Sequence, residues 1–341
     1  MNLKTQDFDY ELPRERIAQY PIEPRDAARL MVIHRETHQI EHTYFNKIGD
    51  FLQQGDLLVI NDTRVIPARL YGKKSGSGGK VEVLLLKKLD SVSWECLVGG
   101  KRVRLNTQVE FGDEIHGVII EEKDSSQRII QFNQPIEPYL SKIGNTPLPP
   151  YIHSHLDNPQ RYQTVYAQWD GSAAAPTAGM HFTQPLINSL EEKGIRFARV
   201  TLHIGLDTFA PVVEDDPQAH QIHTEWCNVP QETVDLINQT KQANRKVIAV
   251  GTTSVRALES AAIHRDDGLL KPFQGVTNLY ILPGFQFRVV DAMITNFHLP
   301  RSTLLMLVSA FAGREWILKV YQLAIQMGYR FYSFGDAMLI L

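Results

Sequence analysis

The sequence has few cysteines and little net charge. Only two cysteines, Cys96 and Cys227, occur in 341 residues, which is too few for a disulfide framework or a cysteine-based zinc site. We expect both to be buried thiols in a reducing compartment. The formal net charge is −3, so no overall basic field indicates nucleic-acid binding, and an RNA partner would need a local cationic patch.

Long hydrophobic runs are also absent. No apolar run approaches the ~20 residues that a membrane helix needs, and the first ten residues contain no apolar signal core. We therefore expect a cytoplasmic protein without a membrane partner. The hydrophobic content of 43% and the charged content of 21% are typical of soluble globular proteins, and the length allows two domains.

Several familiar catalytic motifs are missing from the chain. No Gly-x-Ser-x-Gly elbow and no setting for a cysteine nucleophile is present, which argues against a hydrolase. No glycine-rich loop follows Leu57–Asn61, as an ordinary methyltransferase would require. His220, His223 and Glu225 lack the His-Glu-x-x-His arrangement and a third spaced ligand, so we predict polar loop residues there and no metal.

The first 66 residues predict the start of an α/β domain. Leu57–Ile60 is a buried strand whose end carries Asn61-Asp62-Thr63-Arg64, the position at which α/β proteins present polar site residues. The elements expected before it are a short helix at Arg14–Ala18, a hairpin of Leu30–Ile33 and Gln39–Tyr44, and a helix at Phe45–Leu52.

Residues 67–150 show a different sequence pattern. Short strands separated by glycine-containing and polar turns, without helices, predict a small antiparallel barrel. The strands expected are Ala68–Tyr71, Val81–Leu86, Trp94–Val98, Glu114–Ile120 and Arg128–Phe132. The loops carry lysines, including Lys73, Lys74 and Lys88, which are either ordinary solvated surface or contacts for RNA phosphates.

After residue 150 the pattern returns to alternating strands and helices, which favours a mostly parallel sheet. The predicted fold is therefore an α/β domain of residues 1–66 and 151–341, interrupted by an inserted β-barrel domain of residues 67–150. The elements expected in this part are helices at 184–193, 230–243, 255–263, 304–312 and 315–327, and strands at 195–204, 246–250, 279–282 and 292–294.

A stretch of small residues lies within Tyr162–Thr183. Gly171–Gly179 contains almost only small residues with Pro176 among them, so neither a regular helix nor a packed strand is expected, and the backbone can approach a ligand closely. A flexible linker is the alternative, but aromatic residues flank the stretch on both sides. The predicted cofactor contacts from it are Ala174, Ala175, Thr177 and Gly179, and His181 follows them.

Two turns after predicted strands can also carry chemistry. Gly251-Thr252-Thr253-Ser254-Val255-Arg256 opens a helix, so its N–H groups and hydroxyls can bind an anion; an ordinary capped turn with an Arg256–Glu259 pair is the alternative. Thr295–Pro300 contains Asn296 and His298, which can orient a ligand or move a proton. A capping asparagine beside a spectator histidine is the alternative there.

These segments together resemble the S-adenosylmethionine:tRNA ribosyltransferase-isomerase family of queuosine biosynthesis. The resemblance covers essentially the whole length. The sequence departs from the family pattern at Asp207, where glycine is usual, and at Leu282, where an aromatic residue commonly precedes Pro-Gly. The matching motifs are Arg25–Leu30, Gly55–Arg69, Pro147–Ile152, Tyr162–Thr183, Val200–His203, Gly251–Ser260, Ile294–Pro300 and Tyr329–Met338.

The resemblance implies a tRNA-modifying enzyme. The ribosyl part of S-adenosylmethionine would be transferred and isomerised onto 7-aminomethyl-7-deazaguanine at the wobble position of the anticodon, giving epoxyqueuosine, adenine and methionine. S-adenosylmethionine is then a co-substrate, no cofactor is bound permanently, and the protein is expected to be a monomer. A noncatalytic tRNA-binding module is the alternative, although a protein that only binds tRNA would need no small-residue pocket surrounded by histidines.

Roles for the candidate residues follow from this expected reaction. A base must take a proton from the carbon beside the sulfonium, and departing adenine needs a proton donor. The candidates for these steps are His181, His203 and His298, with Asp62 as an alternative base. Arg256, Thr252 and Thr253 suit the methionine carboxylate or the ribose, Gly251 and Asn296 complete the predicted cofactor site, and Arg64, Arg69, Lys73, Lys74 and Lys88 suit RNA phosphates.

Overall fold

The computed structural model describes residues 3–123, 126–154, 156, 158–205, 211–222, 224–263 and 270–341. Asp207 and His223 lie outside these described residues. The chain forms two compact units. The α/β unit consists of Met1–Arg64, Pro150–Trp169 and Ala175–Leu341, and the barrel unit consists of Val65–Pro149 and Asp170–Ala174.

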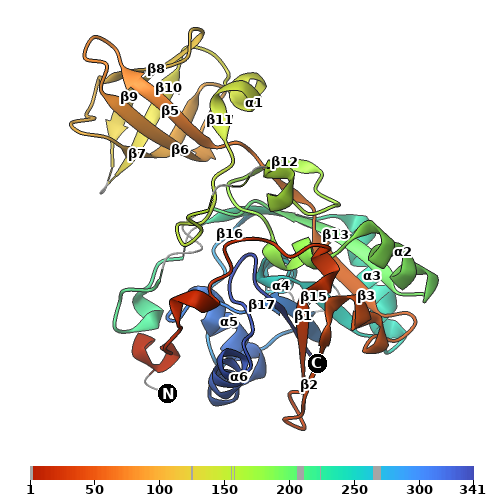
Figure 1. The fold of residues 1–341 in the computed structure, drawn as a ribbon. Coiled ribbons are helices and arrows are strands. Elements are labelled where there is room, and N and C mark those ends of the chain that lie inside the picture. The colour runs from red at the N-terminus through yellow and green to blue at the C-terminus, as the bar shows by residue number, and fades with distance from the viewer. Residues whose placement is uncertain are drawn as a thin grey trace. The chain divides into compact units, whose positions relative to one another are not determined.

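The α/β unit is built on a nine-stranded sheet (Figure 1). Its four central strands are parallel, whereas antiparallel pairs flank them on both sides. Every residue of β3, β15 and β17 is buried, as expected of central parallel strands covered on both faces. In spatial order the strands are β16 (Phe273–Thr277), β14 (Glu225–Val229), β13 (Arg196–Leu202), β3 (Leu57–Asn61), β15 (Val247–Val250), β17 (Ala292–Asn296), β18 (Ala337–Ile340), β1 (Arg29–Ile33) and β2 (Ile40–Tyr44).

Two of the long helices, α2 (Gln184–Glu192) and α5 (Thr303–Ala312), begin at a side-chain cap. The Thr183 hydroxyl accepts from the N–H of Leu186 at the start of α2, and Ser302 caps α5 in the same way. All residues of α4 (Thr252–Ala262) are buried, and this helix packs against β13, β14, β15 and β16. The other long helices of the unit are α3 (Gln231–Gln242) and α6 (Arg314–Gln326).

Short 3₁₀ helices connect the larger elements. One of them, Thr177–His181, occupies the end of the small-residue stretch and contacts β17. The others are Thr5–Phe8, Arg14–Arg16, Arg25–Ala27, Phe45–Asp50, Glu137–Tyr139, Pro159–Tyr162 and Pro217–Ala219.

The barrel unit is an antiparallel sheet that closes on itself. Each strand pairs with the next in the order β5 (Arg69–Lys74), β6 (Lys80–Lys88), β7 (Ser93–Gly99), β10 (Gln127–Phe132), β9 (Ile115–Glu122) and β8 (Gln108–Phe111), and β8 returns to pair with β5. Two-residue β11 (Gly144–Asn145) adds to β5 after the short helix α1 (Leu140–Ile143). Alternate residues such as Val83, Val109 and Ile130 fill the interior. The predicted fold class, an α/β protein with an inserted barrel, is confirmed.

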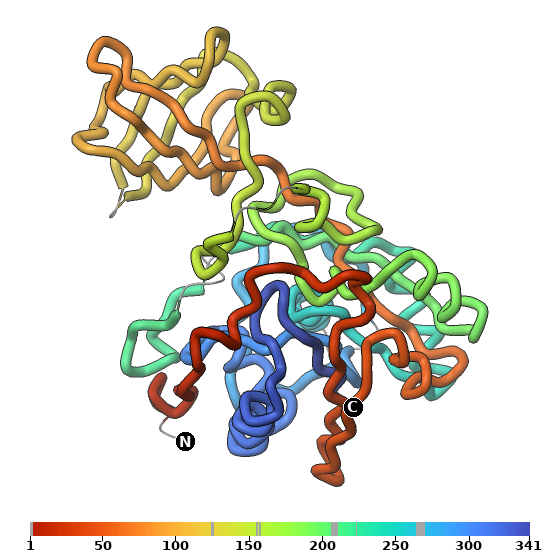
Figure 2. Tube along the Cα trace, viewed as in Figure 1, coloured from red at the N-terminus to blue at the C-terminus, as the bar shows by residue number. Residues whose placement is uncertain are grey.

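The two ends of the chain meet inside the α/β unit. β1 pairs in parallel with β18, and Ile17 forms an isolated parallel bridge with Phe331. The N–H of Phe331 donates to the carbonyl of Arg16 at 2.8 Å. Figure 2 shows the N-terminal segment (red) running beside C-terminal residues (blue).

Most predicted elements are present, but one predicted strand is wrong. Leu279–Leu282 is not a strand; β16 precedes it and ends at Thr277, whose hydroxyl accepts from the N–H of Leu279. Several short strands were not predicted, namely β4 (Thr63–Val65), β8, β11, β12 (Trp169–Ser172), β14, β16 and β18. They are two to five residues long, too short for periodicity to separate them from loops.

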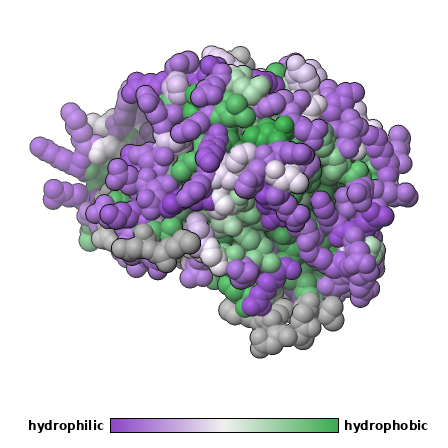
Figure 3. Space-filling view, turned by 90° about the horizontal axis from the view of Figure 1, so that it is seen from below, coloured by the Kyte–Doolittle hydropathy of each residue, from purple (hydrophilic) through white to green (hydrophobic). Residues whose placement is uncertain are grey.

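No helix among the described residues has both the length and the apolar character needed to cross a membrane. On the face shown in Figure 3, hydrophilic residues cover much of the area and hydrophobic residues form patches between them. Scattered apolar surface of this kind is normal for folded proteins.

Barrel closure should depend on Gly72 in β5. A Cβ at this position would lie 2.7 Å from both the carbonyl oxygen of Glu110 and Cγ1 of Val109 in the β8 segment. We expect Gly72→Ala to lower the free energy of unfolding by about 1–3 kcal/mol, because the closing strands must separate. Urea denaturation measures this. Gly79→Ala is the control, because its nearest neighbouring atom is 3.6 Å away; equal stability of the two variants would contradict the expectation.

Candidate active site

A cavity lies where the parallel strands of the α/β unit end. β13, β15 and β17 run in the same direction as β3, so their carboxyl ends share one edge of the sheet, the usual place of ligand sites in open α/β sheets. The cavity has a volume of about 360 Å³ including its solvent-open part. It is lined by Ala175, Pro176, Thr177, Ala178, Ile204, Gly251, Thr252, Thr253, Thr295, Asn296, His298 and Leu304.

The amino-terminal end of α4 forms one wall of this cavity. Gly251 takes a φ of 88°, which glycine adopts without the strain that a side chain would add. First-turn N–H groups of a helix have no partner within the helix and carry partial positive charge. The Thr253 hydroxyl is buried and has no hydrogen-bond partner among the described residues. This wall therefore offers donors to a negatively charged or hydroxyl group.

Asn296 connects three segments around the cavity. Its Oδ1 accepts from Thr177 Oγ1 at 3.0 Å. Its Nδ2 donates to the carbonyl of Tyr332 at 3.2 Å and to Nε2 of His181 at 3.1 Å. Because an amide nitrogen only donates, Nε2 of His181 must be the acceptor, and the neutral imidazole carries its proton on Nδ1.

His181 and His298 are both buried and uncharged near neutral pH. Burial, together with smaller contributions from the positive charges of Arg330 and Arg25, lowers the pKa of His181 to about 3. Burial alone lowers the pKa of His298 to about 3, and its Nε2 lies 2.8 Å from Thr295 Oγ1. Each neutral imidazole has one nitrogen that can accept, but neither carries the second proton that a general acid would give up.

Asp62 and His203 follow the neighbouring strands β3 and β13, but neither lines the cavity. The Asp62 carboxylate accepts from Thr201 Oγ1 at 2.7 Å, and burial raises the pKa of Asp62. Nδ1 of His203 lies 2.8 Å from Thr63 Oγ1, and its ring stacks on Trp226 with the centroids 5.1 Å apart. Next to His203, Ile204 contributes to the cavity instead.

Arg256 lies behind the cavity rather than in its lining. Its guanidinium forms an ion pair with Glu225, with side chains only 5% and 3% exposed respectively, and its Nε donates to the carbonyl of Leu279 at 3.1 Å. The pairing with Glu259, considered as the alternative role of Arg256, does not occur. That carboxylate instead accepts from consecutive backbone N–H groups of residues 288–290.

The small-residue stretch is buried, which rules out a flexible linker. Ala175 lines the cavity, while Ala174 is fully buried and its carbonyl accepts from Ser172 Oγ at 2.7 Å. A Cβ on Gly179 would lie 2.0 Å from the phenolic oxygen of Tyr166. Glycine is therefore required at 179 for packing against tyrosine.

Two of the residues considered for a metal site, His220 and Glu225, have other partners. Nδ1 of His220 lies 2.9 Å from a carboxylate oxygen of Glu214, and Glu225 is paired with Arg256. Within the described ranges, no three or more histidine, cysteine or acidic side chains gather as a metal site would require.

The predicted RNA-contacting lysines lie on the barrel unit. Lys73 and Lys88 are exposed, and Lys88 forms an ion pair with Glu137. The Lys74 ammonium donates to the carbonyl of Arg102 at 2.9 Å. Exposed ion pairs are weak, so these lysines could exchange their partners for phosphate oxygens.

The two predicted RNA-contacting arginines are half-buried. Arg64 donates to the carbonyl of Ala167 in the α/β unit. In the barrel unit, Nε of Arg69 lies 3.4 Å from a carboxylate oxygen of Glu82. Both guanidinium groups thus have partners within their own units.

Sequence analysis missed some residues of the cavity. Pro176, Ala178, Ile204, Thr295 and Leu304 line it without having been predicted as site residues. All except Leu304 lie within, or next to, a motif that had been noted. These positions could therefore have been found by taking each motif as a whole segment, but not by selecting its polar residues alone.

Fold and cavity together define an α/β protein that has a cavity at the carboxyl edge of its sheet and carries an inserted β-barrel. The chain belongs to the family described as queuosine biosynthesis protein, whose model matches residues 5–340. The family resemblance inferred from the sequence motifs is confirmed.

Similar proteins extend this finding over the whole chain. A protein of Symbiobacterium thermophilum named S-adenosylmethionine:tRNA ribosyltransferase-isomerase is 51% identical over 343 residues, covering 99% of this chain and 100% of that protein. One of the same name from Clostridioides difficile is 50% identical over 342 residues, with the same coverage. The crystal structure of S-adenosylmethionine tRNA ribosyltransferase from Thermotoga maritima matches with 40% identity and a TM-score of 0.58, covering 98% of this chain and 100% of the other.

Burial of neutral histidines should make stability depend on pH. Between its ordinary pKa of 6.5 and its value of about 3 in the folded protein, His298 binds a proton only in the unfolded chain. The free energy of unfolding therefore falls as the pH falls through this window, by about 1.4 kcal/mol per pH unit for each such histidine.

We expect the free energy of unfolding of His298→Asn to fall less steeply with decreasing pH than that of the parent protein. Urea denaturation at a series of pH values measures this. The His153→Asn variant is the control, because this side chain is exposed, and it should keep the slope of the parent. Equal slopes for the parent and His298→Asn would contradict the argument.

Proposed function

We propose that this protein is an S-adenosylmethionine:tRNA ribosyltransferase-isomerase. It would transfer and isomerise the ribosyl group of S-adenosylmethionine onto 7-aminomethyl-7-deazaguanine at the wobble position of tRNA, giving epoxyqueuosine and releasing adenine and methionine. The observation that carries this proposal is the identity of about half of all residues, over the full length, with proteins of that name. The cavity supports it, because the motifs behind the resemblance build its walls.

The proposal includes the partners and setting of the enzyme. S-adenosylmethionine is a co-substrate rather than a permanent cofactor, the tRNA carries the precursor base, and the enzyme acts as a cytoplasmic monomer. Residues 1–66 and 151–341 form its catalytic domain and residues 67–150 an inserted domain. The exposed Lys73 and Lys88, with Lys74, Arg64 and Arg69, contact RNA phosphates.

We place S-adenosylmethionine in the cavity at the end of α4. Its methionine carboxylate lies at the amino terminus of this helix, where the N–H groups of Thr252 and Thr253 and the Thr253 hydroxyl can donate to it. Ala175 and Gly251 let the backbone approach the ligand, and Asn296 orients it. Arg256 supports the helix from behind through its pair with Glu225, and Gly179 and Ala174 shape the loop.

Proton transfer is assigned to the histidines nearest the cavity. The sulfonium charge acidifies the neighbouring C–H, so a neutral imidazole held against it can take the proton. His298 lines the cavity and is the base in this proposal. His181 acts next to it through Asn296, while Asp62 and His203, at neighbouring strand ends, are further proposed proton carriers.

A noncatalytic tRNA-binding module is less consistent with this site. A protein that only binds RNA needs basic and aromatic surface. This site instead buries the uncharged His298 in the cavity and the uncharged His181 next to Asn296. It also buries the Thr253 hydroxyl, which has no hydrogen-bond partner among the described residues. Such groups are costly to bury and typical of active sites.

The products of the reaction test the proposed function. With S-adenosylmethionine and precursor-modified tRNA, we expect adenine and methionine in equal amounts and no S-adenosylhomocysteine, because the ribosyl skeleton and not the methyl group moves. Liquid chromatography of the products measures this. His298→Asn should release adenine about 10²- to 10⁴-fold more slowly, as loss of a proton-transfer group predicts. S-adenosylhomocysteine as the main product would reject the assignment.

The Thr253 hydroxyl gives a test of ligand placement. We expect Thr253→Val to weaken S-adenosylmethionine binding about tenfold, measured by calorimetry, while the free energy of unfolding stays equal or rises. The reason is that an unpartnered buried hydroxyl costs stability until a ligand accepts from it. Thr233→Val is the matched control, because its hydroxyl donates to the carbonyl of Arg199 at 2.5 Å; it should lose stability and keep affinity. Normal affinity in Thr253→Val would move the ligand away from α4.

A further inference from the structure

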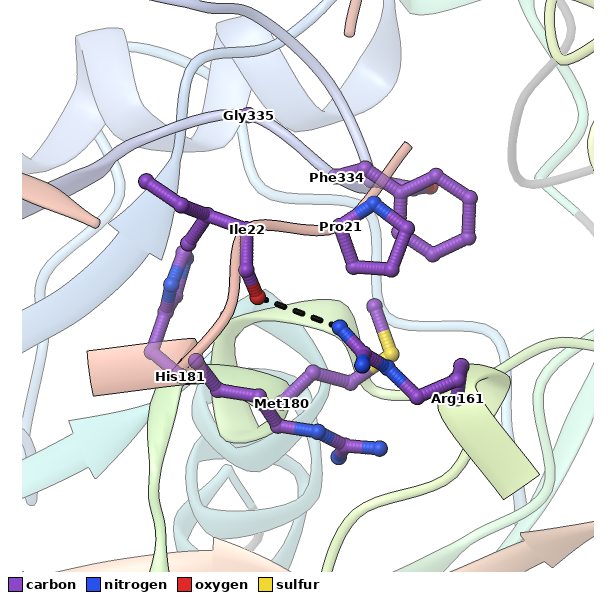
Figure 4. A pocket seen from close by; sticks show the side chains of 9 residues that line it. Pro21, Ile22, Arg161, Met180, His181, Phe334 and Gly335 are labelled. Atoms are coloured by element: carbon purple, nitrogen blue, oxygen red, sulfur yellow. Dashed lines mark hydrogen bonds between the residues drawn. The ribbon is translucent and has the colours of Figure 1, made fainter. Parts of the chain in front are cut away.

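A second cavity lies beside the first one in the α/β unit (Figure 4). Its volume is about 270 Å³ including the solvent-open part. Its lining includes Ile22, Arg25, Arg161, Met180, His181 and Phe334.

One short helix separates the two cavities. In the 3₁₀ helix Thr177–His181, Thr177 and Ala178 line the first cavity, whereas Met180 and His181 line the second. The hydrogen bond from Asn296 to His181 joins the two linings. Ligands in the two cavities would therefore meet on either side of His181.

The arginines of the second cavity have hydrogen-bonding capacity left. Arg25 donates to the backbone carbonyls of Gln160 and Gln163, and within the described part of the chain no carboxylate pairs with it. Arg161 donates to the carbonyl of Ile22 at 3.1 Å, the dashed line in Figure 4, and its buried Nε has no hydrogen-bond partner among the described residues. Half-buried guanidinium groups of this kind suit an anion that supplies several acceptors.

Of the carboxylates that the structure describes, one pairs with these two arginines. Glu23 forms an ion pair with Arg161, and its side chain is 68% exposed. An exposed pair of this kind contributes little stability. A phosphate group, which offers more acceptor oxygens, can therefore displace it.

We propose that the second cavity receives the acceptor nucleotide of the tRNA, with Arg25 and Arg161 holding its phosphate and Ile22 and Phe334 contacting the base. This inference rests on the proposed function, because that reaction needs an RNA nucleotide next to S-adenosylmethionine. Enzymes that modify a base bind it unstacked in a pocket of this kind.

Charge distinguishes this occupant from part of S-adenosylmethionine. That molecule carries a sulfonium and an ammonium against one carboxylate, so two nearby guanidinium groups repel it, whereas they attract a phosphodiester. The positive charges of Arg25 and Arg330 already lower the pKa of His181. The same field would lower the pKa of an aminomethyl group on the base and favour the uncharged amine, the nucleophilic form.

Charge-removing variants of the full-length protein test the inference. Filter binding of precursor-modified tRNA over a range of salt concentrations, and calorimetry with S-adenosylmethionine, are measured for Arg25→Gln and Arg161→Gln. We expect each variant to bind tRNA about tenfold more weakly at low salt and to lower the slope of log K against log salt by about 1. Affinity for S-adenosylmethionine should change less than twofold.

Two further variants separate phosphate binding from a structural role. Glu23→Gln removes the competing carboxylate, so tRNA binding should become a few-fold tighter, which no purely structural role of Arg161 predicts. Arg314→Gln is the control, because Arg314 pairs with Asp7 away from both cavities and should leave both affinities unchanged. If Arg25→Gln fails to fold after losing its carbonyl contacts, Arg161→Gln and Glu23→Gln decide the question.

An unchanged salt slope in Arg161→Gln together with unchanged tRNA affinity in Glu23→Gln would overturn the inference. Loss of S-adenosylmethionine affinity with normal tRNA binding would also overturn it, by placing the co-substrate in the second cavity. Both results leave adenine release by the parent protein intact. Failure of the parent to release adenine would instead reject the proposed function.

Discussion

Both cavities depend on the hydrogen bonds of the buried Asn296 side chain. An amide deprived of water must find partners for its donors and its acceptor, and this one finds them on three separate segments. It fixes Thr177 in the small-residue loop, selects the tautomer of His181, and holds the carbonyl of Tyr332. Tyr332 itself adopts a φ of 71°, a strained conformation for an aromatic residue that persists where surrounding contacts enforce it.

The buried ion pair of the site is separate from the neutral histidines. The ion pair of Arg256 and Glu225 lies behind α4, while His181 and His298 stay uncharged because burial disfavours the imidazolium. A sulfonium co-substrate brings its positive charge with it. A poorly solvated, uncharged base then faces a strong local field, in which electrostatic effects on the reacting C–H exceed those in water.

The local patterns of the sequence predicted the strands and turns that carry the site. They could not predict which residues distant in the sequence would contact the side chains of the site. Apolar runs such as Leu57–Ile60 indicate buried strands. The turns that follow the strands of a parallel sheet must lie at one edge of that sheet. The identity of the partners depends on tertiary packing: Glu225 lies 31 residues before Arg256, and Gly179 is required by Tyr166. Short edge strands such as β14 also depend on pairing, because their own patterns are weak.

The meeting of both chain ends in one sheet has a consequence for synthesis on the ribosome. The barrel strands, β5 to β11, lie within one continuous stretch that emerges early. In contrast, β1 pairs with β18 and Ile17 bridges to Phe331, so the larger sheet is complete only when the last residues have left the exit tunnel. The nascent chain thus carries a folded inserted unit while the hydrophobic strands β1 and β3 are still unpaired. Chaperones would be needed during this interval.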